Sequence, residues 1–445
     1  MTPMTKKHLL RAAAVATAAA AVALPPHFSP AHATPAAGTG ERGVHVVQIH
    51  GTDATEEAVT RRAEEMTADN GGELRRVYHS ALQGFSVSLT EAEVDAYLRD
   101  ARVSSVTGDR TYEVAARPSR PAPHGPHRAG THAPSPPPRD DGGTQPDPPS
   151  WGLDRLDQTD LPLDASYTYP GDAAGTDVYV LDTGVRVSHA EFGGRARAAY
   201  DAVEQREGGR SGTDCHGHGT AMAATAAGSS YGAAKQAGIA SVRAFRCDGT
   251  ATMEHLMTAV DWITTEATAS GRPAVVNLGF SGPPGSVLDL QLYEMTVRGV
   301  AYTAAAGNGD ADGTGGDACD VTPARQTTAI TVAATGPDDT RPKWSNHGSC
   351  AHLFAPGTDI VTAGACSDTA RTTLTGTSAA AAETAGVAAM HLAGHPEATP
   401  RELDAALIAA ATKDRVRDPG EGSGNNLLHT VPAGSATTDD RRAER

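Results

Sequence analysis

From Trp151 onward, short runs of apolar residues alternate along the chain with longer helical segments. The apolar runs are almost unbroken, so both faces of each strand are predicted to be buried. Strands of this kind, separated by helices, favour an α/β fold with a doubly wound, mostly parallel sheet and helices on both faces. Strands are predicted at 177–181, 240–245, 274–278, 300–304 and 329–333, and helices at 253–268 and 288–297.

Residues 44–115 show a different pattern, with two amphipathic segments set among four short strand-like runs. The resulting order, β-α-β-β-α-β, predicts a small α+β domain of the ferredoxin-like kind. Its strands are predicted at 44–49, 74–79, 85–89 and 103–106, and its helices at 56–68 and 91–98.

The first 33 residues have the layout of a secretory signal peptide: a basic start, an apolar run over 12–24 and the small-residue site Ala31-His32-Ala33. The run is too short to span a bilayer, so no membrane anchor is expected from it. A short buried hydrophobic helix is the alternative. We expect a signal peptide at 1–33 and a secreted, extracellular protein.

A stretch rich in Pro, with Gly, His and Arg, separates the two folded regions. Such a composition cannot bury enough apolar surface to fold, so it predicts an exposed linker that proteases can reach. The expected organisation is a signal peptide at 1–33, a small domain at 44–115, a linker at 116–150, a large domain at 151–432 and a polar tail at 433–445.

The net charge of −16 comes from 37 basic and 53 acidic residues, which argues against nucleic acid as a partner. Export would permit disulfides, and the chain has five cysteines, all after residue 210. Because five is odd, at least one cysteine must stay unpaired or bond to another chain.

Four separated segments carry residues that hydrolysis of an amide bond would need. Asp182 follows a buried strand, His218 opens an Ala-rich helical segment, Asn308 follows the run 304–307, and Ser378 stands at the head of a helix. Each has an ordinary structural interpretation when taken alone, such as a turn or a helix cap.

A zinc site is a further interpretation of the second segment. His216 and His218 could bind zinc together with Cys215, which would make the protein a zinc hydrolase. No HExxH or CxxC spacing supplies further ligands.

Taken together and in this order, the DTG, HGT, AAxGN and GTS motifs resemble those of the subtilases, most closely the proteinase K and aqualysin branch, over about 151–431. The resemblance implies a serine endopeptidase in which Ser378 is the nucleophile, His218 the general base and then acid, and Asp182 the group that orients the imidazole. Asn308 and the Ser378 backbone N–H would form the oxyanion hole.

The resemblance also implies a strand that pairs with extended substrate, and hence broad specificity for protein and peptide substrates with an apolar or aromatic residue before the cut bond. The implied substrate-binding residues are Leu278, Gly279, Phe280, Ser281, Gly282, Ala306 and Gly307. Three segments depart from the family's usual residues: Ala221, 379–383 and 279–282. A subtilase-like protein that binds peptides without cleaving them is therefore a second hypothesis.

The cysteines resemble aqualysin positions, which implies the disulfides Cys215–Cys247 and Cys319–Cys350 and leaves Cys366 over. No cofactor is expected in the chemistry. A structural calcium ion is suggested by residues that match a site of that branch, although a solvated acidic face is the alternative. These residues are Asp154, Asp157, Gln158, Asp164 and Ser166; a carboxylate of a different family calcium site is Gly336 here.

Residues 44–115 resemble the inhibitor-type propeptide that precedes subtilase domains. The resemblance implies a folding template and intramolecular inhibitor, and thus a self-processing zymogen. An independent binding module is the alternative, because a fold alone does not define a function. We expect a monomer.

Overall fold

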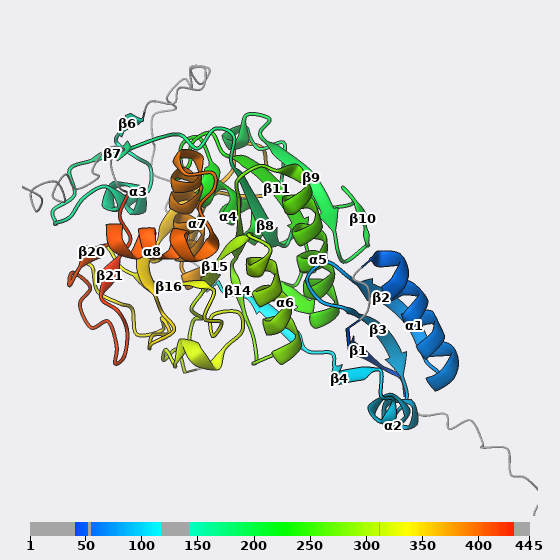
Figure 1. Cartoon of the computed structure of the whole chain (residues 1–445). Helices are drawn as coiled ribbons and strands as arrows, with labels where there is room; N and C mark the ends of the chain where they lie inside the picture. The colour runs from blue at the N-terminus through cyan, green and yellow to red at the C-terminus, as the bar shows by residue number, and fades with distance from the viewer. Residues whose placement is uncertain (1–40, 52–54, 117–141, 311, 431–445) are drawn as a thin grey trace, which may run out of the picture. The chain divides into compact units, whose positions relative to one another are not determined.

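The computed structural model describes residues 41–51, 55–116, 142–310 and 312–430 (Figure 1). The predicted signal peptide, most of the predicted linker and the predicted tail lie outside these residues. In the part of the chain that is described, no helix is both long enough and apolar enough to cross a membrane.

The N-terminal domain is an antiparallel sheet of four strands in the order β2-β3-β1-β4, with two helices. Thr90 and Glu93 form a capping box that starts α2, and the core contains Val47, Phe85 and Tyr97. The elements follow the predicted order: β1 (Gly43–Ile49), α1 (Glu56–Asn70), β2 (Glu73–Tyr78), β3 (Gly84–Leu89), α2 (Glu91–Arg99) and β4 (Val103–Gly108).

The large domain is built on a ten-stranded sheet that is parallel from β9 to β21 and has an antiparallel strand at each edge. The central strands are buried along most of their length, as predicted from their unbroken apolar runs. In spatial order the strands are β10 (Arg206–Glu207), β9 (Ala196–Asp201), β11 (Gly238–Arg243), β8 (Asp177–Asp182), β13 (Ala274–Leu278), β15 (Ala301–Ala305), β16 (Ile330–Thr335), β17 (Leu353–Pro356), β21 (Asn426–Leu427) and β20 (Thr412–Lys413).

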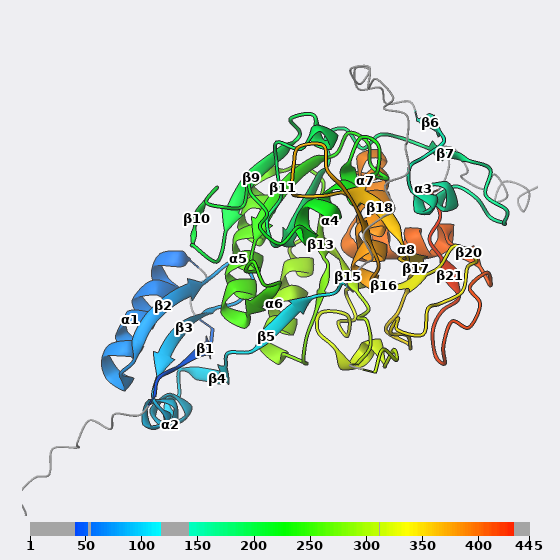
Figure 2. The same cartoon turned by 180° about the vertical axis from the view of Figure 1, so that it is seen from behind.

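Helices cover both faces of this sheet (Figures 1 and 2). Alternate residues of β8 show why: Val178 and Val180 pack with the alanines of α4 and α7, whereas Tyr179 and Leu181 pack with α5 and α6. Gly386 lets α7 approach α4 closely, because an added Cβ would overlap the Ala226 carbonyl oxygen. The helices are α3 (Trp151–Leu156), α4 (His218–Ala227), α5 (Met253–Ser270), α6 (Ser286–Val297), α7 (Thr377–Gly394) and α8 (Pro400–Ala410).

Short strand pairs complete the fold, and one of them lies where the sequence predicts linker. Strand β6 (Gly143–Pro146) pairs with β7 (Ser166–Tyr169), and Gln145 accepts a hydrogen bond from the buried Lys235. The last residues of the expected linker therefore pack on the large domain. The remaining strands are β5 (Thr111–Val114), β12 (Thr250–Thr252), β14 (Phe280–Ser281), β18 (Ile360–Ala363) and β19 (Arg371–Leu374).

Glu383 is a buried carboxyl in the middle of α7, next to Gly152 of α3. Its Oε2 has no hydrogen-bond partner among the described residues, and burial holds its pKa well above the usual range. As the pH rises, the unfolded chain therefore loses this proton before the folded chain does. Glu383 stabilises the fold fully only below its unfolded pKa of about 4.3, and this contribution falls at higher pH.

We therefore expect Glu383→Gln to be increasingly stabilising relative to wild type as the pH rises above about 4.3, by up to about 1.4 kcal/mol per pH unit. The measurement is the free energy of unfolding at a series of pH values between 4 and 9, on protein inactivated with a serine reagent. A difference between the two proteins that does not change with pH would contradict a buried, neutral Glu383.

Candidate active site

Three side chains that lie far apart in the sequence meet at the carboxyl edge of the large sheet. Asp182 ends β8, His218 begins α4 and Ser378 is the second residue of α7. His218 Nδ1 lies 2.9 Å from both carboxylate oxygens of Asp182, and its Nε2 lies 3.1 Å from Ser378 Oγ. All three residues are at most 2% exposed. A hydroxyl, an imidazole and a carboxylate that are linked in this order by hydrogen bonds can move a proton away from the serine.

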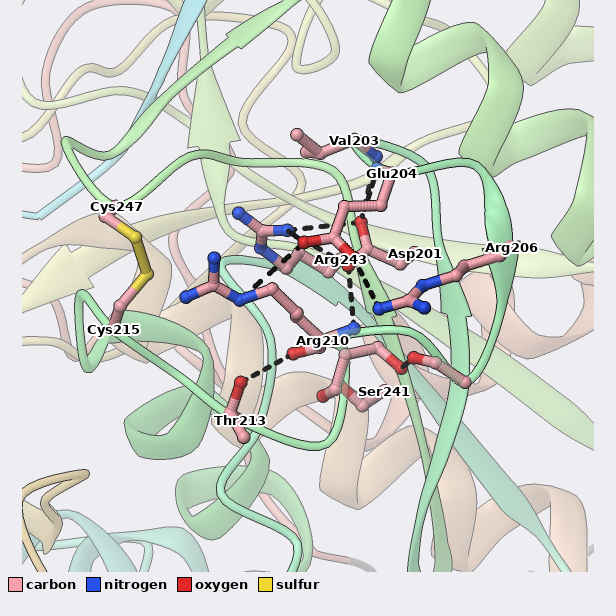
Figure 3. Close-up of polar contacts among 12 residues, drawn as sticks. Asp201, Val203, Glu204, Arg206, Arg210, Thr213, Cys215, Ser241, Arg243 and Cys247 are labelled. Carbon is pink, nitrogen blue, oxygen red and sulfur yellow. Dashed lines mark hydrogen bonds and ion pairs between the residues drawn. A yellow bond between two sulfur atoms is a disulfide. The ribbon is translucent and has the colours of Figure 1, made fainter.

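Neighbouring strand β11 fixes the end of β8. Arg243 is the cross-strand partner of Asp182, and the next two N–H groups, those of Ala244 and Phe245, donate to the Asp182 carbonyl oxygen at 2.9 and 3.1 Å. Arg243 in turn makes a buried ion pair with Asp201 at 3.0 Å (Figure 3). The paired charges compensate one another, which permits Arg243 to be buried beside the strand end that bears Asp182.

Asn308 lies at the start of α7 with a fixed amide orientation. Its Oδ1 accepts hydrogen bonds from the backbone N–H and the hydroxyl of Thr377, both at 2.9 Å. An added Cβ on Gly376 would lie 3.2 Å from Asn308 Nδ2 and would overlap the carbonyl oxygen of Ala115. The Asn308 amino group, the start of α7 and a peptide carbonyl therefore converge on one place, where donors could stabilise an oxyanion.

The peptide that brings this carbonyl is the end of the N-terminal domain. Strand β5 lies between β12 and β14 in a three-stranded antiparallel sheet. At the end of β5, Val114 N donates to the Gly249 carbonyl oxygen at 3.1 Å, and the next residue, Ala115, donates its N–H to the carbonyl oxygen of Gly279 at 2.8 Å. The Ala115 side chain packs against Ala305 and Ala381. Residues 111–115 thus occupy the groove beside Ser378 as an extended peptide.

The residues expected to bind substrate divide into two groups. Gly279, Phe280 and Ser281 pair with the 111–115 segment, and Gly282 packs against the Tyr112 ring. The other three lie behind the groove: Leu278 is part of the core, and Ala306 and Gly307 connect β15 to Asn308. The sequence analysis did not identify Gly249, Ala305 or Ala381, since a glycine in a turn and alanines in buried elements have no distinctive pattern.

Two of the three family departures lie in the core, whereas the third, 279–282, lines the groove. Ala221 and Ala379–Ala382 are fully buried in α4 and α7, where small side chains permit the close packing of these helices. They take no proton-transfer group away from the site.

The structure contains the disulfides Cys215–Cys247 and Cys319–Cys350, the two pairs that the resemblance implied (Figure 3 shows the first). Cys366 is a free, exposed thiol on the wall of a cavity of about 550 Å³ that His218 also lines. The zinc interpretation conflicts with this arrangement, because Cys215 is oxidised and both ring nitrogens of His218 face other partners.

The residues suggested for calcium lie around the start of β7. Asp154 Oδ1 and Asp157 Oδ1 are buried without a hydrogen-bond partner among the described residues, and burial raises the pKa of both carboxyls. Asp164 Oδ1 accepts hydrogen bonds from Ser166, and Gln158 Oε1 accepts one from Asp164. Carboxylate oxygens are the kind of ligand that a hard cation prefers. In the part of the chain that is described, however, no group of three or more His, Cys, Asp or Glu side chains is arranged to hold a metal.

Comparison with known families agrees with this geometry. Residues 173–429 match the subtilase family, and residues 37–115 match the peptidase inhibitor I9 family. The chain belongs to the subtilase family. The expected fold class is confirmed, as is the expectation that this subtilase is a serine-type endopeptidase with an inhibitor-type propeptide.

Individual relatives cover much of the chain. It is 37% identical over 360 residues to an extracellular serine proteinase of Thermus sp. (strain Rt41A), covering 81% of this chain and 78% of the relative. It is 40% identical over 281 residues to alkaline serine exoprotease A of Vibrio alginolyticus, covering 63% of this chain and 50% of the relative. Among solved structures it resembles a cold-adapted subtilisin-like serine proteinase with 39% identity and a TM-score of 0.59, covering 63% of this chain and 98% of that one.

Proposed function

We propose that this subtilase is a secreted endopeptidase of broad specificity, made as a zymogen that cuts itself. The observation that carries the proposal is the Ala115 carbonyl, which lies beside Asn308 and the start of α7 in the groove that Ser378 borders. A peptide bond is thus already presented to the nucleophile in the precursor. The relatives' names also support secretion, since one is an extracellular proteinase.

In the proposed reaction, Ser378 Oγ attacks the carbonyl carbon of the bound peptide while His218 Nε2 takes the hydroxyl proton. Asp182 holds Nδ1–H and stabilises the imidazolium. The negative charge that develops on the carbonyl oxygen is bound by Asn308 Nδ2 and the Ser378 backbone N–H. His218 then returns the proton to the leaving amine as the C–N bond breaks, and water, activated by His218, releases the acyl group.

We further propose that the first bond cut in the precursor joins Ala115 to Ala116. The backbone pairing of residues 111–115 with the groove ends at Ala115, and Ala116 lines the cavity next to His218. This assignment places the residues up to Ala115 in the propeptide and makes the chain from Ala116 onward the processed protein. N-terminal sequencing and mass measurement of the secreted protein would test it: Ala116 should be the new N-terminus, and a first cut elsewhere would refute it.

The propeptide is held by charge as well as by its extended end. Arg75 makes a bidentate ion pair with the buried Glu254 of α5, with distances of 2.8 and 2.9 Å. Asp261, about two turns further along α5, accepts hydrogen bonds from the backbone N–H groups of Ser80 and Ala81. These contacts support the role of the propeptide as an intramolecular inhibitor.

A subsite for an aromatic residue follows from the same segment. Tyr112, the fourth residue counted back from the proposed bond, is fully buried, and its ring meets Phe280 edge-on with centroids 6.1 Å apart. Added Cβ atoms on Gly282 or Gly285 would overlap it. Its hydroxyl has no partner among the described residues, and burial raises its pKa to about 12, so the pocket recognises the ring and not the hydroxyl.

We expect the mature enzyme to cleave a peptide containing Thr-Tyr-Glu-Val-Ala-Ala with kcat/KM about 10- to 100-fold higher than the same peptide with Ala in place of Tyr, because about 1.5–3 kcal/mol of aromatic burial is lost. Phe should serve as well as Tyr. The matched control replaces the neighbouring Glu, which corresponds to the exposed Glu113, and should change kcat/KM less than threefold. Equal effects at both positions would contradict the subsite.

Inhibition tests the enzyme class directly. Sulfonyl or phosphonyl reagents should abolish hydrolysis of a peptide anilide by modifying Ser378, whereas a chelator should not act on the chemistry. Loss of activity to the chelator alone would contradict the proposed mechanism.

Two further proposals concern a bound calcium ion and the oligomeric state. We propose that calcium binds near Asp154 and Asp157, where the two unpartnered carboxylate oxygens support a cation, and that it has a structural role only. We also propose that the enzyme acts as a monomer, because Asp182, His218, Ser378 and Asn308 all come from one chain.

A further inference from the structure

Asp214 joins the two segments that carry Asp182 and His218. Its Oδ1 accepts a hydrogen bond of 2.9 Å from the hydroxyl of Thr183, the residue that follows Asp182. Its Oδ2 accepts hydrogen bonds from the backbone N–H and the hydroxyl of Thr220, at 2.8 and 2.7 Å. Thr220 is the third residue of α4, which begins at His218. One carboxylate is therefore bonded to a residue next to Asp182 and to a residue in the first turn of the His218 helix.

The start of α4 depends on these contacts because its N-cap residue cannot supply them. Gly217 is the N-cap, with φ of 101°, and it has no side chain to accept the free N–H groups of the first turn. Asp214 and Thr183 take over this role: Gly219 N donates to Thr183 Oγ1 at 3.0 Å, and Thr220 N donates to Asp214 Oδ2 at 2.8 Å. Asp214 Oδ1 also fixes the turn before the helix, where it accepts hydrogen bonds from Gly217 N and His216 N at 2.7 and 3.1 Å. The carboxylate also places negative charge at the positive end of the helix.

We infer that Asp214 and Thr183 form a positioning pair that sets the place of the His218 ring between Asp182 and Ser378. The inference rests on the proposed function. The imidazole must stay within hydrogen-bond distance of Asp182 and Ser378, at 2.9 and 3.1 Å. His218 is also the first residue of a helix whose N-cap has no side chain to cap it. A displacement of about 1 Å in such a group can cost about 100-fold in rate. Asp214 thus acts through His218 and not on the substrate.

The test compares Thr183→Val, which removes the hydroxyl at nearly constant volume, with Thr183→Ser, which keeps it, and with Asp214→Asn, whose amide cannot accept at both positions. Rates are measured on a short peptide anilide, per active site titrated with a phosphonyl reagent. We expect kcat to fall about 10- to 100-fold in Thr183→Val and Asp214→Asn with KM within about twofold of wild type. Thr183→Ser should stay within about threefold of wild-type kcat.

A second measurement separates positioning from a loss of stability. In a His218→Ala background, Thr183→Val should not lower the remaining rate further, because the group that it positions is already absent. An unchanged kcat per titrated site in Thr183→Val, or an equal loss in the His218→Ala background, would overturn the inference. If Asp214→Asn fails to fold, the Thr183 pair still decides. A wild-type protein without hydrolysis would instead refute the proposed function.

Discussion

Replacing Ser378 by alanine should leave the secreted chain uncut and inactive. The hydroxyl is the nucleophile of the proposed reaction, 3.1 Å from His218 Nε2, and among the described residues no other side chain forms a hydrogen bond with that nitrogen. The expected loss in kcat is about 10⁶-fold, a figure taken from subtilisin itself, a member of the same family. The change removes one buried oxygen atom from the end of a helix, so the fold should persist.

The measurement combines mass, N-terminal sequence and hydrolysis of a peptide anilide for wild type and Ser378→Ala. Wild type should begin at Ala116 and turn over substrate, whereas the variant should keep its propeptide. Ser270→Ala, at an exposed serine at the end of α5, is the matched control and should mature normally. If Ser378→Ala were processed like wild type, another protease would perform the first cut. If both proteins were silent, the peptide-binding hypothesis would take precedence.

Replacing Asn308 by leucine should lower kcat by about 10²- to 10³-fold and leave KM nearly unchanged. Leucine has the shape of asparagine but cannot donate to the carbonyl oxygen when negative charge develops there, so the loss is confined to the transition state. The size again comes from subtilisin, where an asparagine donor was removed. In wild type, Thr377 orients the Asn308 amide through two hydrogen bonds of 2.9 Å. The amino group is therefore already in position before the negative charge develops, and little free energy is needed to orient it in the transition state.

Kinetics on a peptide anilide would test this prediction, with the concentration of functional sites set by titration with a phosphonyl reagent. A rise in KM at constant kcat would mean that Asn308 binds the ground state, and the oxyanion assignment would be wrong. A lower fraction of titratable sites with normal kcat would mean that the change only weakens the fold.

The sequence alone determined the character of the buried elements. Unbroken apolar runs such as 274–278 predict strands covered on both faces, because a half-exposed strand would alternate apolar and polar residues. Strand β13 has those bounds, and β11 lies two residues earlier than expected. The edge strands β10 and β20 were not predicted. Two-residue strands carry no periodic pattern, and their pairing comes from neighbours in space.

The sequence also indicated the chemistry, because the types and order of its motifs are specific to one family. It could not show that Asp182, His218 and Ser378 meet, since 36 and 160 residues separate His218 from its two partners. Parallel strands bring such distant segments to a common edge, so this proximity is a property of the sheet.

Three features were decided by tertiary structure only. The burial of Glu383 depends on α3 packing over α7, and the link between the Asp182 and His218 segments depends on the hydrogen bond from Thr183 to Asp214, 31 residues apart in the sequence. The placement of Ala115 depends on the N-terminal domain, which lays its last strand between β12 and β14. Local sequence patterns indicate which side chains are apolar and which can react. Long-range packing determines which of these side chains are buried away from water and which come within hydrogen-bond distance of one another. The separate motifs therefore form one site only in the folded protein.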